Sequence, residues 1–409
     1  MPQIRTFFGA SELRMLACIG GFRLKESRAR SPCSSPGVLQ MPTDRLLSRR
    51  QSLLLAPISA AAVLSTGWSA PRLPAAATAL PAVQVSGVRR AFWNGEHNAF
   101  TDLCWFRNRI WLTFRSCPDG HMVHPTSCII VLCSEDLGVT WQEMHRFSVP
   151  LRDTRDPHFL VFRDRLFVYT GTWYSGKTTL PRGDYDLNQH LGYAAFTDDG
   201  SAWHSPVMLE GTFGHYIWRA AATGNKAWLC GRRKPGFEVL ARGEPRETES
   251  LILESDDGLV WRRGGQFQSE AGDETAFQFA SDGSGLAIAR HGAGLAAGLL
   301  QAPAPGGPWT RTDLGQPIGG PLLTRWQNRW VVAGRRTVPN TGPRTAFWWL
   351  TDGRLEPMVE LPSGGDNSYP GLVELPDGRA LISWYSSHEL TDQGQPMTAI
   401  YLAELEAGG

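Results

Sequence analysis

Apolar and polar positions along this chain form a pattern that occurs six times. An apolar or aromatic run meets a short polar turn and returns as a second apolar run, as in HFLVFRDRLFVYTG and GPLLTRWQNRWVVAGR. Each occurrence predicts a β-hairpin of two buried strands. The six hairpins are predicted over Ala99–Arg115, His158–Gly171, Tyr216–Gly231, Thr275–Arg290, Gly320–Arg335 and Tyr369–Tyr385.

The spacing of the hairpins predicts the fold class. Their starts lie about 45 to 60 residues apart, a period typical of a β-propeller with one four-stranded sheet per blade. We therefore expect an all-β, six-bladed β-propeller with antiparallel blades. The third strands are predicted at Cys128–Cys133, Leu191–Phe196, Ser250–Glu254, Ala297–Gln301, Thr345–Leu350 and Ala399–Glu404.

The sixth blade has no fourth strand of its own, because little sequence follows Ala399–Glu404. The segment Val83–Trp93 (VQVSGVRRAFW) has strand character and lies before the first hairpin. We predict that it supplies the missing edge and closes the ring, since an unpaired strand edge promotes aggregation.

The first 80 or so residues differ in composition from the rest. Residues 1–40 precede a plausible start at Met41 and are interpreted as a spurious or disordered extension. Residues 41–82 are interpreted as an export signal and linker, and the propeller as 83–409. The paired arginines of Ser48-Arg49-Arg50, the apolar run Leu53–Leu64 and the small-residue site Ala77-Thr78-Ala79 suggest a twin-arginine-like signal and a periplasmic or secreted protein. A membrane anchor and a disordered tail are the alternatives, although the run is short for a stable span.

Charge and motifs exclude several function classes. A net charge of +1 gives no reason to expect nucleic acid as a partner. No glycine-rich phosphate loop is present, and the Cys and His spacings do not indicate zinc, so we expect no cofactor and no dedicated metal site, although propeller loops can bind Ca2+ without a readable motif. Four of the five cysteines after residue 80 fall in the first blade, where a disulfide is possible: Cys104, Cys117, Cys128 and Cys133.

Hairpin geometry predicts where chemically useful side chains gather. The start of the first strand and the end of the second lie at one edge of the sheet. A rim rich in Arg, His, Tyr and carboxylates suits an anionic or strongly hydroxylated ligand such as a sugar acid. The candidates at this rim include His97, Asp102, Arg115, Arg155, Asp156, His158, Trp173, Arg232, Glu274, Arg290, Arg335, Arg336, Asp366, Tyr369, Tyr385 and His388.

Three turns after the third strands share a motif. They begin at Ser134, Thr197 and Ser255, and each places Asp and Gly before a Trp. We interpret their aspartates as residues that stabilise the turn by accepting hydrogen bonds from backbone N–H groups, with no catalytic role. These turns resemble the Asp boxes of the sialidase superfamily, whose members are six-bladed propellers. The resemblance covers about Ala91 to Glu404.

The order of rim residues strengthens this resemblance. In sialidases a glutamate, two arginines and a tyrosine occur in the order of Glu274, Arg290, Arg335 or Arg336, and Tyr369. The resemblance implies that Tyr369 is the nucleophile, that Glu274 takes its proton, and that the arginines bind a carboxylate. Tyrosine nucleophiles are a recognised exception among glycosidases.

The chain also departs from the family pattern. Sialidases carry a third arginine at the start of the first blade, whereas this chain has Asn98-Ala99-Phe100-Thr101 there. Arg115 is our substitute for it. Asp119 and Thr126 lie near the place of the usual proton donor without matching it, and Asp156 and Asp102 are our alternatives.

These residues predict an exported, sialidase-like glycoside hydrolase that removes a terminal, acidic sugar from a glycan partner. Two alternatives stay open: a non-catalytic glycan-binding propeller, and a propeller glycosidase or lyase that acts on a different sugar. The further substrate-binding candidates are Asp102, His97, His158, Asp366 and His388.

Overall fold

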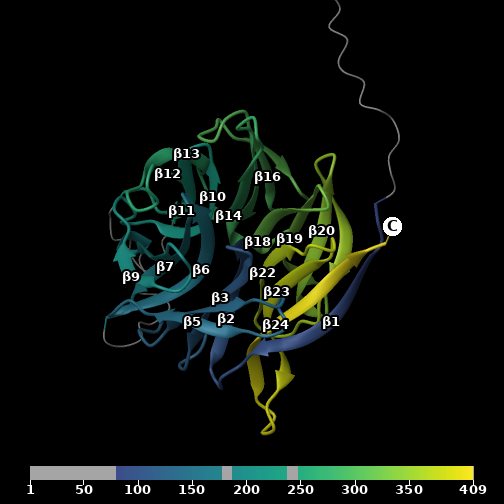
Figure 1. Cartoon of the computed structure of the whole chain (residues 1–409). Coiled ribbons are helices and arrows are strands. Elements are labelled where there is room, and N and C mark those ends of the chain that lie inside the picture. The colour runs from purple at the N-terminus through teal and green to yellow at the C-terminus, as the bar shows by residue number, and fades with distance from the viewer. Residues whose placement is uncertain (1–79, 177–186, 237–246, 409) are drawn as a thin grey trace, which may run out of the picture. The chain divides into compact units, whose positions relative to one another are not determined.

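The computed structural model describes residues 80–176, 187–236 and 247–408, and these form six four-stranded antiparallel sheets around a common axis (Figure 1). The six-bladed propeller is therefore confirmed. Blade one contains β2 (His97–Phe106), β3 (Arg109–Cys117), β4 (Cys128–Ser134) and β5 (Gln142–Phe147). Blade two contains β6 (Arg152–Phe162), β7 (Arg165–Tyr174), β8 (Leu191–Thr197) and β9 (Trp203–Met208). Blade three contains β10 (Tyr216–Thr223), β11 (Lys226–Arg233), β12 (Glu249–Ser255) and β13 (Arg262–Gln268).

The remaining three blades repeat this order. Blade four contains β14 (Gly272–Phe279), β15 (Gly285–His291), β16 (Gly298–Ala302) and β17 (Thr310–Asp313). Blade five contains β18 (Gly319–Trp326), β19 (Arg329–Val338), β20 (Gly342–Thr351) and β21 (Arg354–Glu360). Blade six contains β22 (Asn367–Glu374), β23 (Ala380–Leu390), β24 (Pro396–Ala407) and β1 (Val83–Phe92).

The predicted closure of the ring is confirmed. Strand β1 pairs antiparallel with β24, with Val83 opposite Ala407 and Phe92 opposite Ile400. Figure 1 shows the blue β1 lying along the yellow β24, so that the two ends of the propeller meet in one blade. The predictions for residues 1–79 lie outside the described residues.

Burial decreases from the axis to the outside of each blade. Strand β3 is buried almost throughout, because neighbouring blades cover both of its faces. The outermost β17 is exposed at all of its positions. Long apolar runs therefore specify the inner strands, whereas the outer strands have little apolar signal.

Turn chemistry fixes the hairpins and the outer turns. The residues Arg107-Asn108, Arg163-Asp164 and Gln327-Asn328 all have positive φ, as the two-residue type I′ turn requires. In the turn after β4, Asp136 Oδ1 accepts the Thr140 amide at 2.8 Å, and Ser134 Oγ accepts the Gly138 amide at 2.8 Å. These hydrogen bonds agree with the prediction that the aspartates stabilise the turns by accepting from backbone amides.

The possible disulfide in blade one does not form. Among the described residues, all five cysteines are free thiols. Cys104 and Cys133 both pair with Trp111, from either side of β3. They are thus two strand spacings apart, about 9.5 Å, which exceeds the reach of a disulfide.

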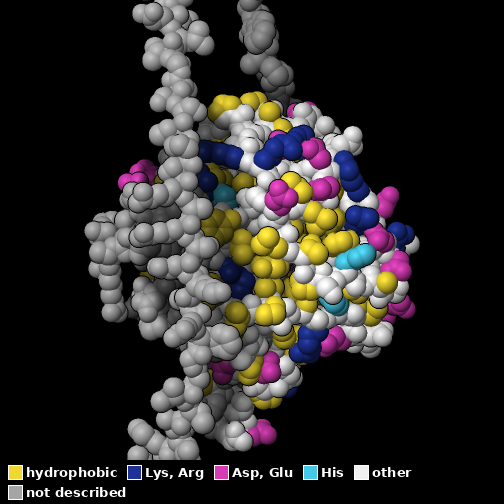
Figure 2. Space-filling view, turned by 90° about the vertical axis from the view of Figure 1, so that its left-hand side faces the viewer, with side chains coloured by type: hydrophobic (Ala, Val, Ile, Leu, Met, Phe, Trp, Pro, Cys, Tyr) yellow, Lys and Arg dark blue, Asp and Glu magenta, His cyan; other side chains and the backbone are white. Residues whose placement is uncertain are grey.

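Hydrophobic side chains also reach the outer surface. Figure 2 views the side of the molecule where β9 and β12 are labelled in Figure 1, and it shows a band of hydrophobic side chains with charged ones around it. Exposed large hydrophobic residues in and between blades two and three include Met208, Phe213 and Val260. No helix within the described residues is long and apolar enough to cross a membrane.

Candidate active site

Every inner hairpin carries a β-bulge near the start of its first strand. The register shifts there in all six blades, so that two residues face one on the second strand. Bulges re-aim side chains, and a positive φ at a non-glycine residue costs about 1–3 kcal/mol. Three first bulge residues have this strained backbone: Phe100 (φ 63°), Asp156 (φ 50°) and Tyr369 (φ 52°).

These three residues line one cavity of about 370 Å3 at the rim where the blades converge. All six blades contribute to its wall. Its lining consists of aromatic, arginine and carboxylate side chains together with one histidine: Phe100, His121, Arg155, Asp156, Trp173, Tyr216, Arg232, Glu274, Arg290, Arg335, Asp366, Tyr369 and Tyr385.

A tyrosine and a glutamate are in direct contact in this cavity. Tyr369 Oη donates a hydrogen bond to Glu274 Oε1 at 2.5 Å, and both side chains are buried. Burial raises the pKa of Tyr369 well above its ordinary value. Burial alone would also raise the pKa of Glu274, but Arg290 and the Tyr369 hydroxyl hold it below its usual range. The pair therefore consists of a neutral phenol and a carboxylate able to accept its proton.

Backbone from blade five holds the glutamate in place. The Gly320 amide donates to Glu274 Oε2 at 3.0 Å. A Cβ on Gly320 would lie 2.7 Å from Tyr369 Cδ2, and its φ of 57° disfavours other residues. Glycine at this position thus lets the tyrosine ring and the glutamate approach one another.

Arginines surround the pair. Arg290 Nη1 donates to Glu274 Oε2 at 2.8 Å, and its Nε lies 3.2 Å from Asp273 Oδ2. Arg232 donates to the other oxygen of Asp273. Arg335 Nη1 donates to the Asn367 carbonyl at 3.3 Å and lies 3.6 Å from Asp366 Oδ1. The cavity wall is therefore equipped to bind an anion.

Asp156 lies on the same wall with a distinct environment. Burial raises the pKa of Asp156 to about 7, with Glu274 acting in the same direction. The Tyr216 hydroxyl bonds its Oδ2. Its Oδ1 is buried without a hydrogen-bond partner among the described residues. Asp156 thus keeps its proton through weakly acidic pH and can give it to a ligand.

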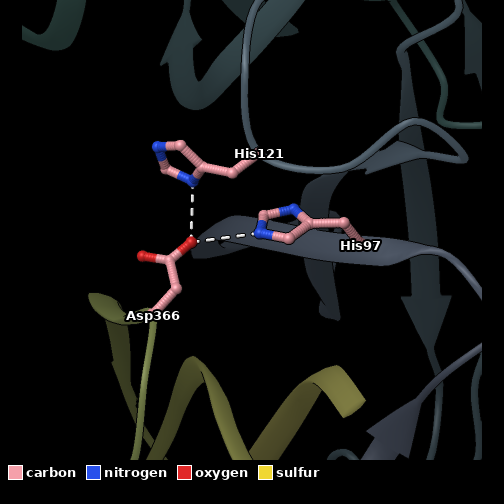
Figure 3. A group of neighbouring side chains, drawn as sticks. All are labelled: His97, His121 and Asp366. Carbon is pink, nitrogen blue, oxygen red and sulfur yellow. Dashed lines mark hydrogen bonds and ion pairs between the residues drawn. The ribbon is translucent and has the colours of Figure 1, made fainter. Parts of the chain in front are cut away.

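Two histidines meet one aspartate at the edge of the cavity (Figure 3). His97 Nε2 lies 3.0 Å, and His121 Nδ1 2.7 Å, from Asp366 Oδ2. Burial would raise the pKa of Asp366, but hydrogen bonds from the two imidazoles hold it well below its usual range. Of these residues His121 and Asp366 line the cavity, and His97 is not part of its lining.

Several predicted site residues lie elsewhere. Arg115 is fully buried and donates to Asp153 Oδ1 at 3.0 Å and to the Gly120 and Met122 carbonyls at 3.0 Å. It therefore fixes the loop after β3 and does not reach the cavity. Arg336 pairs with Glu360 at 2.8 Å, so Arg335 is the blade-five arginine at the cavity. His388 packs on Tyr401, away from the cavity lining.

Asp102 and His158 line a separate, smaller cavity of about 120 Å3. Asp102 accepts from Arg219 Nη1 at 3.0 Å and from the Phe159 amide at 2.9 Å. Arg219 also donates to the Pro321 and Pro370 carbonyls at 2.9 and 2.8 Å. This buried network joins five blades, which indicates a structural role, and neither Asp102 nor His158 lines the larger cavity.

Some cavity residues had been given no role from the sequence. Arg155, Trp173, Arg232 and Tyr385 fall at the predicted rim, and their hairpin positions were the signal that placed them there. Phe100, His121 and Tyr216 were not among the rim candidates. Phe100 and Tyr216 occur in apolar strand starts that read as packing, and His121 lies in the loop between β3 and β4.

Comparisons with known proteins support the fold. No family model and no curated protein matches the sequence. Among solved structures, Trypanosoma rangeli sialidase in complex with the inhibitor DANA superposes with a TM-score of 0.58 at 14% identity, over 80% of this chain and 60% of that one. Phage phi92 endosialidase gives 0.56 at 11% identity, over 79% and 69% of the two chains. Hadza microbial sialidase Hz136 gives 0.53 at 13% identity, over 75% and 65%. This chain thus spans about 60% of the length of the trypanosomal enzyme and shares the fold of these sialidases.

Proposed function

We propose that this chain is an exported, sialidase-like glycoside hydrolase that removes a terminal acidic sugar from glycans. One observation carries the proposal: the 2.5 Å hydrogen bond from Tyr369 Oη to Glu274 Oε1, inside a cavity lined by arginines. A neutral phenol is a weak nucleophile, and an adjacent carboxylate is the group that can take its proton. Export rests on the twin-arginine-like segment around Ser48-Arg49-Arg50.

We propose a double-displacement mechanism for these groups. Tyr369 Oη attacks the anomeric carbon as Glu274 accepts its proton, and Asp156 protonates the departing glycosidic oxygen. Water then attacks the anomeric carbon and gives a proton to Asp156, while Glu274 returns its proton to the departing Tyr369 oxygen, so that the anomeric configuration is retained. Arg290 and Arg335 bind the carboxylate of the sugar. A phenol places no negative charge against an anionic substrate.

The wall contributed by blade one bears on the choice of sugar. Phe100 occupies that wall, and Arg115 is engaged with Asp153. The family resemblance implies a carboxylate-binding arginine from blade one, and neither of these two residues supplies it to the cavity. This favours including sugar acids other than sialic acid among the substrates.

A panel of substrates tests the proposal. The purified full chain is incubated with sialosides, uronosides and neutral glycosides, and released sugars are identified by chromatography and mass spectrometry. We expect release from an acidic terminal sugar, with retention of configuration by proton NMR. Binding to these glycans without release of any sugar would instead identify a non-catalytic glycan-binding propeller.

The proton donor predicts a pH dependence. Because Asp156 must carry a proton to act as the acid and its pKa is about 7, kcat/KM is expected to fall as pH rises above about 7. Asp156→Asn should lower kcat/KM by about 10²–10⁴-fold and remove this alkaline limb. Asp119→Asn, a change in an acid that accepts from Thr126 Oγ1 at 2.5 Å, is the control. If kcat/KM no longer fell above about pH 7 in Asp119→Asn but still fell in Asp156→Asn, then Asp119 would be the proton donor.

A further inference from the structure

Three side chains at the edge of the cavity present donor atoms to a common point. His97 Nε2, His121 Nδ1 and a carboxylate oxygen of Asp366 all lie within 4.8 Å of one another. Both imidazoles point at the same atom, Asp366 Oδ2, as the dashed lines in Figure 3 show. We propose that this cluster binds one divalent cation of the Zn2+ class. The proposal concerns a site other than the Tyr369–Glu274 pair and does not depend on the proposed function.

The donor set and its spacing fit such an ion. Two imidazoles with one carboxylate are a common three-ligand set for zinc and for other borderline metals, with further positions left for water or a ligand. Bonds of about 2.0 Å in tetrahedral geometry place donor atoms roughly 3.3 Å apart. The observed separations from Asp366 Oδ2 are 3.0 Å to His97 and 2.7 Å to His121. Small side-chain rotations therefore suffice to admit the ion.

Neighbouring groups hold the carboxylate in the required orientation. Tyr385 Oη donates to Asp366 Oδ1 at 2.9 Å, and Arg335 Nη1 lies 3.6 Å from the same oxygen. Both contacts engage Oδ1 and leave Oδ2 directed at the two imidazoles. Groups of this kind around metal ligands typically change affinity by about 10–100-fold when they are removed.

The cluster is accessible on one side. The His121 side chain is 44% exposed, that of Asp366 25% and that of His97 11%. His121 and Asp366 also line the cavity that holds Tyr369. An ion bound here would present its free positions to the cavity, beside Arg335, where an anionic oxygen of a ligand can bind.

The ligands come from separate parts of the chain, which explains why no metal motif is readable. His97 begins β2, His121 lies in the loop before β4, and Asp366 directly precedes β22. His97 and Asp366 are 269 residues apart. Closure of the ring brings blades one and six together and thereby assembles the cluster.

Titration of the metal-free full chain tests this site. ZnCl2 is followed by isothermal calorimetry, and CoCl2 by the visible absorption of a low-symmetry Co2+ centre. We expect one ion per chain at this site, with His97→Ala and His121→Ala each weakening binding by about 100-fold or more. Tyr385→Phe should weaken it by about 10-fold, since Asp366 would lose its orienting hydrogen bond.

His204→Ala is the matched control. His204 is also an exposed histidine beside an aspartate, 3.7 Å from Asp198, but within the described part of the chain it belongs to no cluster of three metal-ligating side chains. The His204→Ala variant should bind Zn2+ with the same affinity as the unmodified chain. The absence of binding at 100-fold molar excess of Zn2+, or affinity unchanged in both His97→Ala and His121→Ala, would overturn the proposal. Because no glycan enters the assay, either result is separate from the outcome of the substrate panel.

Discussion

A Tyr369→Phe variant is expected to lose turnover by roughly 10³-fold or more while it still binds the ligand. The change removes the single atom proposed to attack the sugar. It keeps the ring that packs against Phe100, Trp218 and Tyr385. Glu274 keeps its contacts with Arg290 and the Gly320 amide, so its carboxylate stays held. The measurements are kcat from released sugar and the dissociation constant of the product sugar.

Tyr401→Phe provides the matched comparison. Tyr401 belongs to the same blade, is as deeply buried, and lies outside the cavity lining. Its variant should keep full activity. If the proposed adduct forms, a 2,3-difluoro derivative of the released sugar acid should add its mass to the Tyr369 peptide. Equal turnover in the Tyr369→Phe and Tyr401→Phe variants would contradict the assignment of the nucleophile.

The second large effect concerns stability. Replacing Arg219 with methionine is expected to lower the free energy of unfolding by about 3–5 kcal/mol, the usual cost of leaving one partner of a buried ion pair unpaired. Arg219 is 7% exposed, and Asp102 would lose its charged partner. The Pro321 and Pro370 carbonyls would also lose a donor. Urea unfolding followed by tryptophan fluorescence measures the change.

Arg336→Met is the control for this variant. Arg336 and Glu360 form an ion pair at 2.8 Å, with side chains that are 32% and 45% exposed. Such pairs contribute about 0–1 kcal/mol, so this variant should unfold close to the unmodified protein. Similar losses in the two variants would show that Arg219 is not the central link between the blades. Adding Asp102→Asn to Arg219→Met should cost less than the sum of the two single changes.

Much of the fold could be predicted from the sequence because its signals are local. Apolar runs mark the inner strands, since those strands are buried on both faces. Short polar segments mark the turns between them, although the type I′ geometry at Arg163-Asp164 is seen only in the structure. Strand β1 was predictable because blade six lacked an edge. The absence of a disulfide was not predictable, since it depends on Cys104 and Cys133 lying on either side of β3.

The site was predictable only in part, for a physical reason. The hairpin positions place Tyr369, Glu274 and Asp156 at one rim. They do not show which side chains are already hydrogen-bonded to neighbouring residues and so cannot contact a ligand. Arg115 was expected at the ligand, yet Asp153 of the next blade binds it. His121 could not be placed at all, since it belongs to a loop whose course depends on the contacts of Arg115 and Arg155 with its carbonyl groups.

Because β1 pairs with β24, the propeller can close only after its last strand has been synthesised. Strand β1 leaves the ribosome before any blade exists, and its partner is made last of all the strands. Until then β1 has an open edge that can join other chains. The same final blade carries Tyr369 on β22, about three hundred residues behind β1. A nascent chain therefore acquires its proposed nucleophile, Tyr369, shortly before β24 can close the ring, and termination before residue 369 leaves neither.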